Sequence, residues 1–459
     1  MTIPNQNNVM KQNYKIKKGL DLHLEGKAAP TLDSLLFRTE VALQPDDFCG
    51  IVPRVLVKEG ESVLAGSPLF ADKATGLIKF TSPVSGVVTQ VERGERRKVL
   101  SIRVRPDSKQ ACKDFNVENW EKFSAEEMTQ LLLDSGMFAF LRQRPYDVVP
   151  SPSESPKAIF VSAFNKMPLA ADFSYVVEGQ EDDFKNGLRA LAKIAKLYLG
   201  ISPEQVNTAI LPVKEADVRI FDGPNPAGNV GVQINHIDPV NKGEVVWTLA
   251  PEEAIFIGRL LRTGKIDMTR RIALAGAEVK EPRYMEVTLG TKVDDILNGQ
   301  LEEATHCQRI IDGNPFVGRQ TTKEGFLGAH STELCVLPDG GDVNEAFGWI
   351  LPRLNQFSTN RSYFSWLQPK KAYNLDCRIK GGERHMIMSA EYEKVFPMDI
   401  YPSYLIKAII TGDIDRQEAL GIYEVAPEDF AVAEFVCSSK LELQRIVREG
   451  LDTLRKENA

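Results

Sequence analysis

Apolar and polar residues alternate most regularly between residues 51 and 105. Positions 100–105 read Leu-Ser-Ile-Arg-Val-Arg, which is the period of a strand with one buried face. Glycines, together with the pairs Ser82-Pro83 and Ser85-Gly86, interrupt the apolar runs, as expected where short strands turn corners. This stretch is therefore predicted to form a small barrel of short strands.

The spacing becomes helical after the barrel and then alternates between strand and helix. Ser124 and Glu127 have the spacing of a capping box before a run of leucines, which predicts a helix. Amphipathic stretches at 181–198, with Gly200 as its C-cap, and at 251–261 predict two more helices. The predicted strands are short apolar runs typical of a buried parallel sheet: 158–161, 209–211 and 218–221. We expect a Rossmann-like α/β domain.

The last third of the chain changes character twice. Residues 271–338 return to short strands, with one helical turn at 293–297, which is expected of a compact β-grasp unit. From residue 347 onward the pattern is mainly helical, and Ser439 and Glu442 have the spacing of a capping box before the final helix.

The charge balance and the polar N-terminus exclude several classes of protein. A net charge of −7 does not provide the basic face that phosphate neutralisation requires, so no nucleic-acid partner is expected. No apolar run approaches the roughly 18 residues of a membrane span. The stretch through Lys18 is polar, unlike a secretory signal. Residues 1–13, rich in Asn and Gln, are expected to be a disordered tail.

Several chemical signatures are missing from the sequence. The six cysteines form no C-x-x-C pair, so the sequence has no local signature of a zinc ribbon or an iron–sulfur cluster. Because the cysteines are scattered along the chain, we expect free thiols and a reducing compartment. The pairs His306-Cys307 and His330 with Cys335 are too loosely spaced for us to predict a metal site. The chain also has no G-x-G, P-loop or G-x-S-x-G motif, which argues against tight NAD binding and against a hydrolase nucleophile.

Residues 57–104 resemble a lipoyl/biotinyl-type barrel, down to the tripeptide Asp72-Lys73-Ala74 that such carriers place at a hairpin tip. The stretch from Lys73 to Gly86 is too long for such a carrier. We therefore expect a lipoyl/biotinyl-like barrel-sandwich hybrid without the modified lysine. A carrier modified on Lys73 remains the weaker alternative.

One loop stands out by its prolines and glycines. Within residues 221–240, the candidate binding or docking residues are Gly223, Asn225, Gly228, Gly231, His236 and Asp238. Such a loop at a sheet end is typical of a binding site. It is equally typical of a structural crossover whose turns need these residues. Composition leaves both interpretations open.

The same loop gives the sequence a family resemblance. Residues 223–240, together with 16–27, 144–150 and 158–172, resemble in order the signature of the A subunit of the sodium-translocating NADH:quinone oxidoreductase. The resemblance covers residues 14–459. The family loop often has histidines where this chain has Asn225, Gln233 and Asn235, so a shared metal site is not expected there.

The resemblance implies a peripheral subunit on the cytoplasmic face of the bacterial inner membrane. Its partners would be subunits B to F of a six-subunit complex, and it would touch the membrane only through them. That complex couples NADH oxidation and quinone reduction to Na+ export. The A subunit would contribute to quinone access, with quinone as substrate. NAD, FMN or FAD, and iron–sulfur clusters would belong to the partner subunits.

The family is similar to the C subunit of the Rnf complex and to the flavin-binding subunit of respiratory complex I, which hold FMN or NADH on a glycine-rich loop. The corresponding stretch here has Phe138, Phe140 and Leu141 in place of glycines. Those side chains would keep the backbone from a flavin phosphate. Of the relatives' C-terminal cluster ligands only Cys437 remains, and one thiolate cannot hold a cluster that needs four.

A quinone needs an apolar slot with one or two donors to its carbonyls. Phe138, Phe140, Arg144 and Tyr146 offer this combination on one segment. The alternative is that the phenylalanines are ordinary core and that Arg144 pairs with an acid. For the whole chain, two further alternatives are a scaffold without a small-molecule site and a free-standing flavin- or NADH-dependent enzyme.

These expectations divide the chain at the proline- and serine-rich connector 150–156 and at the changes of pattern. The expected units are a tail (1–13), the barrel-sandwich domain (14–110), a helical connector (111–150), a Rossmann-like α/β domain without a nucleotide motif (151–270), a β-grasp, SLBB-like domain (271–340) and a helical C-terminal domain resembling a cluster-free ferredoxin-type domain (341–459).

Overall fold

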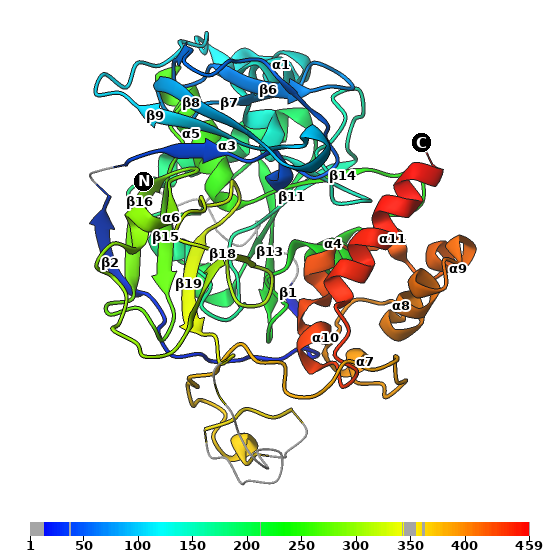
Figure 1. The fold of residues 1–459 in the computed structure, drawn as a ribbon. Coiled ribbons are helices and arrows are strands. Elements are labelled where there is room, and N and C mark those ends of the chain that lie inside the picture. Colours follow the sequence, from blue (N-terminus) through cyan, green and yellow to red (C-terminus); the bar gives the residue numbers. More distant parts are fainter. Residues whose placement is uncertain are drawn as a thin grey trace, which may run out of the picture.

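The structure is a computed structural model that describes residues 13–35, 38–211, 213–341, 343, 355–359 and 363–458. Almost all of the expected N-terminal tail, and the start of the expected helical region at residue 347, lie outside the described residues. In Figure 1 the barrel lies above a central α/β domain, with a second sheet on one side and the C-terminal helices on the other.

The α/β domain is built on a six-stranded sheet with four parallel strands in its centre. The strand order is β1-β13-β12-β11-β14-β10, with β1 parallel to β13 and β10 antiparallel to β14. The strands are β1 (Asn13–Lys15), β10 (Arg142–Arg144), β11 (Ala158–Ser162), β12 (Leu197–Ile201), β13 (Ala216–Asp222) and β14 (Val246–Leu249). The winding direction reverses between β11 and β14, which is the point where such sheets bind ligands.

Helices cover both faces of this sheet. They are α2 (Phe173–Val176), α3 (Glu181–Ile194), α4 (Val230–Ile237) and α5 (Pro251–Thr263). Residues of α3 and α5 share a large apolar core with β11 and β12, whereas Ile234 of α4 packs with Phe160 on the opposite face. Helices α3 and α5 cross at glycines. A Cβ at Gly258 would lie 1.7 Å from the Asp183 carbonyl oxygen, and one at Gly187 would lie 1.9 Å from that of Ala254.

Two sequence predictions for this domain are wrong. The helix expected over 181–198 ends at Ile194, and Gly200 lies inside strand β12 rather than at a helix C-cap. Residues 197–201 are apolar throughout, and periodicity alone cannot tell such a run from the end of a buried helix. The run 209–211 is a turn and not a strand.

The barrel is confirmed as two small antiparallel sheets packed on each other. Its strands are β3 (Val41–Leu43), β4 (Pro53–Val55), β5 (Ser62–Val63), β6 (Pro68–Asp72), β7 (Lys79–Thr81), β8 (Gly86–Arg93) and β9 (Val99–Pro106). The barrel core includes the stacked rings of Phe70 and Phe80. The predicted capping box of α1 (Ala125–Ser135) is present, because Ser124 and Glu127 each accept the other's backbone N–H.

The second six-stranded sheet has the order β18-β17-β19-β15-β16-β2. Its elements are β2 (Ala29–Ser34), β15 (Thr269–Ala275), β16 (Arg283–Thr288), β17 (Gln308–Asp312), β18 (Arg319–Thr321), β19 (Glu333–Pro338) and the predicted turn α6 (Val293–Leu297). Strand β2 pairs in parallel with β16. The segment before the barrel therefore supplies one strand to each of the other two sheets.

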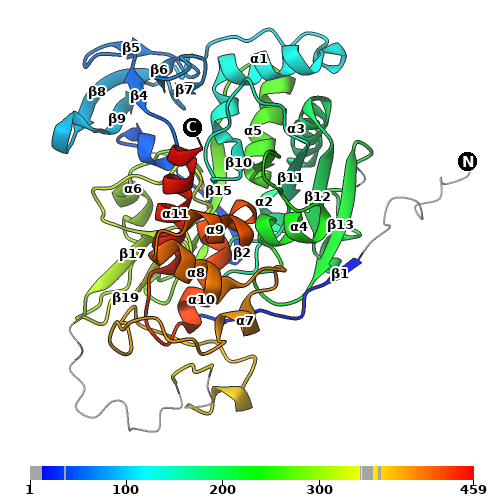
Figure 2. The same ribbon diagram turned by 90° about the vertical axis from the view of Figure 1, so that its right-hand side faces the viewer.

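The C-terminal helices pack against α4 and the loop before it (Figure 2). They are α7 (Tyr392–Val395), α8 (Pro402–Ile410), α9 (Ile414–Ala419), α10 (Ala431–Val436) and α11 (Leu443–Glu457). The predicted capping box at Ser439 is wrong: α11 begins at Leu443 without a side-chain cap, and the Ser439 hydroxyl instead accepts the backbone N–H of Ile387. No helix among the described residues is long and apolar enough to cross a membrane.

Candidate functional site

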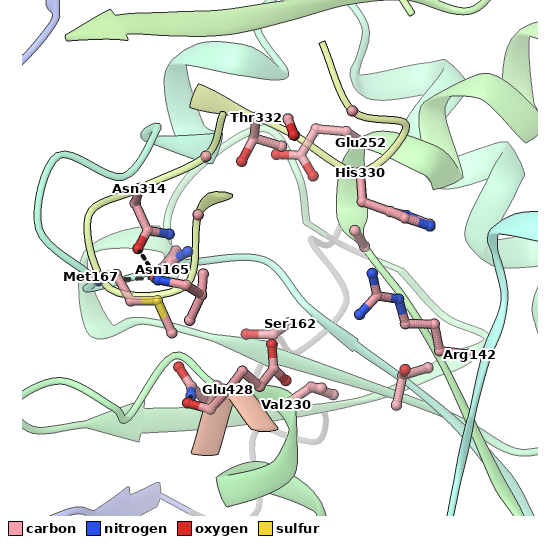
Figure 3. A pocket seen from close by; sticks show the side chains of 18 of the residues that line it. Arg142, Ser162, Asn165, Met167, Val230, Glu252, Asn314, His330, Thr332 and Glu428 are labelled. Carbon is pink, nitrogen blue, oxygen red and sulfur yellow. Dashed lines mark hydrogen bonds between the residues drawn. The ribbon is translucent and has the colours of Figure 1, made fainter. Parts of the chain in front are cut away.

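A cleft of about 450 Å³ opens where the domains meet. Its floor is the carboxyl edge of the α/β sheet, with Ser162 at the end of β11 and Thr248 in β14. Its walls come from the first turns of α4 and α5, from the loop 328–333 of the second sheet and from Glu428 of the C-terminal region. Figure 3 shows Glu252, His330 and Thr332 on one side of the cleft and Ser162, Val230 and Glu428 on the opposite side. The cleft therefore lies at the switch point between β11 and β14.

The cleft wall is strongly acidic. Eight carboxyl side chains line it against three guanidinium groups and one imidazole. The carboxyl groups are Asp46, Asp47, Asp147, Glu252, Glu253, Asp312, Glu333 and Glu428. All three arginines, at positions 142, 144 and 319, already pair with acids. A negatively charged ligand would meet repulsion here unless it displaced these pairs.

His330 and Glu253 join two domains at the cleft. The Nδ1 atom of His330 lies 2.8 Å from Oε1 of Glu253, whose Oε2 accepts the backbone N–H of Ala250 at the start of α5. The rings of Phe48 and Phe140 meet the His330 ring edge-on at 5.6 and 5.8 Å. Burial would raise the pKa of Glu253, but the charge of His330 and its hydrogen bond outweigh it and lower that pKa.

The neighbouring Glu252 behaves differently. It occupies the second position of α5, is 7 % exposed and lines the cleft. Burial, the largest effect, raises the pKa of its carboxyl to about 7, and the charge of Glu253 adds to this. Burial likewise raises the pKa of Glu333 across the same wall. Adjacent glutamates thus have opposite pKa shifts, because only Glu253 has a basic partner.

Arg144 is held in a buried ion-pair cluster. Its guanidinium lies 2.8 Å from an oxygen of Asp429 and 3.0 Å from one of Glu428. Burial would lower the pKa of Arg144, but the charges of Asp429, Asp147 and Glu428 raise it well above its usual range. Burial raises the pKa of Glu428 to about 7 even though Arg144 opposes this. The cluster joins β10 to the C-terminal region at the edge of the cleft.

The four quinone candidates do not converge on one slot. Phe140 and Arg144 line the cleft, whereas Phe138 and Tyr146 are not among the residues that line it. Phe138 is fully buried and meets Trp247 edge-on at 5.5 Å. Tyr146 faces the C-terminal helices, with its ring 6.5 Å from that of Tyr423.

The candidates on the loop mostly form contacts inside the molecule. Gly228 alone lines the cleft. Two of the others contact the N-terminal segment: Gly223 packs on Ile16, and the backbone of Asn225 accepts the N–H of Leu20 and donates its N–H to Asp21. The ring of His236 contacts that of Tyr14 in the same segment. Gly231 packs on Asp429 of the C-terminal region, and Asp238 forms an ion pair with Lys157. The loop thus connects the sheet to the N-terminal segment and the C-terminal helices.

Two further residues, Lys73 of the lipoyl-carrier resemblance and Cys437 of the iron–sulfur resemblance, can also be placed in the structure. Lys73 is exposed at the turn between β6 and β7, where the Asp72 carboxylate accepts the N–H and hydroxyl of Thr75. Cys437 is buried, with its Sγ atom 2.9 Å from the hydroxyl of Tyr392. Among the described residues no group of three or more His, Cys, Asp or Glu side chains is arranged to hold a metal ion.

Sequence reasoning missed the acidic wall of the cleft. The available signal was the pair Glu252 and Glu253 directly after an apolar strand, because the residues that follow parallel strands gather at one edge of the sheet. The position of His330 carried no such signal, since it comes from another domain.

Three family profiles match the chain. They are the NqrA N-terminal barrel-sandwich hybrid domain over residues 14–107, the NqrA second alpha/beta domain over 123–266 and the NQRA C-terminal domain, of SLBB type, over 271–323. Half of an NAD+-reducing [NiFe]-hydrogenase chain overlays 49% of this chain with 14% identity and a TM-score of 0.33, which is too low to indicate a shared fold.

Curated relatives match over the whole length. The A subunits of the Na(+)-translocating NADH-quinone reductases from Haemophilus influenzae and Hahella chejuensis are each 36% identical, and that from Neisseria meningitidis is 35% identical. Each alignment covers 96% of this chain and 99% of the relative. The chain therefore belongs to the NqrA family, which forms the A subunit of the Na+-translocating NADH-quinone reductase, an oxidoreductase complex.

Proposed function

We propose that this chain works as a peripheral subunit of such a membrane complex and that its cleft binds the headgroup of a quinone. The full-length match to relatives named for that complex supports the first part. The second part rests on the cleft at the switch point of the sheet, whose volume of about 450 Å³ is in the range of small-molecule sites.

The charge of the cleft favours a neutral ligand over a nucleotide. A phosphate needs unpaired donors or a bare helix N-terminus. Here the first turn of α5 carries two glutamates and the arginines are paired. The first turn of α4 carries no acidic residue of its own, but the carboxylate of Asp429 packs on its Gly231. A quinone headgroup is uncharged, and the rings of Phe140 and Phe173 with Leu249 offer it an apolar surface. Thr248 and His330 are available there as hydrogen-bond donors.

We further infer that the chain has no redox group of its own. Phe138 and Phe140 are buried core side chains in the stretch that the sequence resemblance places opposite the glycine-rich loop of flavin-binding proteins. Cys437 is engaged with Tyr392. NAD, flavins and iron–sulfur clusters would then belong to the partner subunits B to F. Through those partners the chain would sit at the cytoplasmic face of the membrane.

A titration tests the quinone site. The probe is a fully substituted short-chain benzoquinone, whose ring cannot add the thiol of Cys49 at the cleft. Val317 lies at the cleft and is 37% exposed, so Val317→Trp should fill it and abolish binding. Val52→Trp, on the barrel surface, is the matched control and should bind like the wild type. A lack of saturable binding by folded wild-type protein would contradict the quinone site.

A scaffold without a small-molecule site is the second candidate. It is favoured by Arg144, Tyr146 and Gly231, which hold the C-terminal region instead of forming an open slot. Under this alternative the chain would co-purify with membrane subunits from native membranes but would bind no quinone. A chain that purifies alone from those membranes would contradict the assignment to a complex.

A further inference from the structure

Glu252 is a buried carboxyl aimed into the cleft without a partner. It is 7 % exposed and lines the cleft wall beside Thr332 (Figure 3). No other side chain in the described part of the molecule hydrogen-bonds to its carboxyl, which contacts only its own backbone N–H. The oxygens of Glu252 are not fully enclosed, so they reach the open cleft. A buried side chain whose carboxyl opens into a cavity indicates a place where a ligand can take up its hydrogen bonds.

The surroundings of Glu252 favour its uncharged form. The charged groups that face it are Glu253 on its own helix, Arg270 from β15 and Glu333 from β19. Arg259 and Arg270 line a small hollow behind it, but neither approaches within ion-pair distance of its carboxyl. Two carboxyl groups and deep burial outweigh one guanidinium, and the pKa of Glu252 rises to about 7 as a result.

A protonated carboxyl can donate a hydrogen bond, which a carboxylate cannot. The wall beside Glu252 thus presents an O–H donor to a neutral acceptor and repels anions. His330 and Thr332, both from the loop of the second sheet, lie on the same wall as Glu252. A carbonyl oxygen on a flat apolar ring is the acceptor that matches this donor and the aromatic surface of Phe140.

We propose that the protonated Glu252 carboxyl donates a hydrogen bond to a carbonyl oxygen of the ligand in this cleft, and that this bond selects neutral carbonyl compounds over anions. This proposal rests on the quinone site proposed above. It adds a specificity-determining residue that binds the substrate directly, and it requires that binding weaken when Glu252 loses its proton.

The test is the affinity of the full chain for the fully substituted short-chain benzoquinone between pH 6 and pH 8.5. If only the protonated form binds, the apparent Kd of the wild type should rise more than about tenfold over this range. Glu252→Gln retains a donor that does not titrate, so its Kd should be nearly constant with pH. Glu252→Ala should bind weakly at every pH. Glu303→Gln, the same exchange at an exposed site outside the cleft, is the matched control and should keep the wild-type pH dependence.

The outcomes separate this proposal from the proposed function. Saturable binding whose Kd is independent of pH in the wild type, or equally pH-dependent in Glu252→Gln, overturns the role of Glu252 and leaves the quinone site standing. If no variant and no wild-type protein binds, while circular dichroism shows them folded, both proposals are overturned. Weak binding by Glu252→Gln at every pH would likewise rule out the donor role.

Discussion

The imidazole of His330 and the carboxylate of Glu253, 2.8 Å apart, connect the second sheet to helix α5 of the α/β domain. Glu253 also caps α5 through the N–H of Ala250. One buried carboxylate thus positions both the helix that bears Glu252 and the loop that forms the facing part of the cleft wall. Because the rings of Phe48 and Phe140 that contact His330 are apolar, removal of Glu253 would leave the imidazole without this hydrogen bond. Removal of His330 would leave Glu253 only its bond to the N–H of Ala250 among these contacts.

Glu253→Ala should therefore destabilise the protein by about 3 kcal/mol, since breaking a buried pair leaves an uncompensated group and the helix also loses a cap. The measurement is the free energy of unfolding in urea at pH 7. The pKa of Glu253 is lower in the folded state, so its contribution is full at neutral pH and is lost as pH falls through that lowered pKa. Glu303→Ala, at an exposed site, should change the stability little. Equal effects of the two substitutions would contradict the pairing.

Arg144→Ala should loosen the C-terminal region. The substitution leaves the carboxylate of Asp429, which is 2 % exposed, without its ion-pair partner. A loss of about 3–5 kcal/mol in the free energy of unfolding is therefore expected. Limited proteolysis should cut the variant first within residues 390–458. Arg445→Ala removes two exposed ion pairs at the start of α11, with Glu442 and Glu449, and should cost under about 0.5 kcal/mol. Wild-type resistance of Arg144→Ala to protease would mean that other contacts hold these helices.

The crossing of α3 and α5 should tolerate no added methyl group. In Gly258→Ala the new Cβ would lie 1.7 Å from a backbone carbonyl oxygen, so the two helices must separate. The expected loss is at least about 2 kcal/mol, within the range of overpacked cores. Gly382→Ala is the matched control, because nothing lies within 4 Å of its Cβ. Thermal denaturation followed by circular dichroism distinguishes them, and similar melting temperatures would contradict the close crossing.

Glu252 should make the stability fall as pH rises. Its pKa is raised from an ordinary 4.5 to about 7 in the folded state, so the folded chain keeps a proton that the unfolded chain releases. The contribution of Glu252 to stability is then full below pH 4.5 and declines until pH passes the folded pKa. Between pH 5 and pH 8 the wild type should lose roughly 2 kcal/mol more than Glu252→Gln. Parallel stability curves for the two proteins would show that Glu252 titrates normally.

Much of the fold follows from local sequence signals. The alternation at 100–105, the capping box at Ser124 and the helical turn at 293–297 each depend on neighbouring residues, and the structure confirms all three. The signal failed where tertiary context decides. Residues 197–201 are apolar on every side because the strand is buried on both faces, and the run then resembles a continued helix.

The site was harder to predict from the sequence than the fold. The cleft combines side chains from strand ends, from the loop 328–333 and from Glu428, which are far apart in the chain. The prediction that placed four residues of one segment around a ligand assumed that sequence neighbours face one space. In the structure a 3-10 turn at Met137–Phe140 sends Phe138 and Phe140 to different neighbours. That Glu252 and His330 line the same wall is apparent only from the three-dimensional structure.

The two N-terminal strands affect how the polypeptide can be made. Strand β1 pairs with residues 220–222 and β2 with residues 283–286, so both strands are synthesised long before their partners. The barrel can close while translation continues, but β1 and β2 stay unpaired until then. Their open edges would need shielding in the meantime, since exposed strand edges invite pairing with other chains.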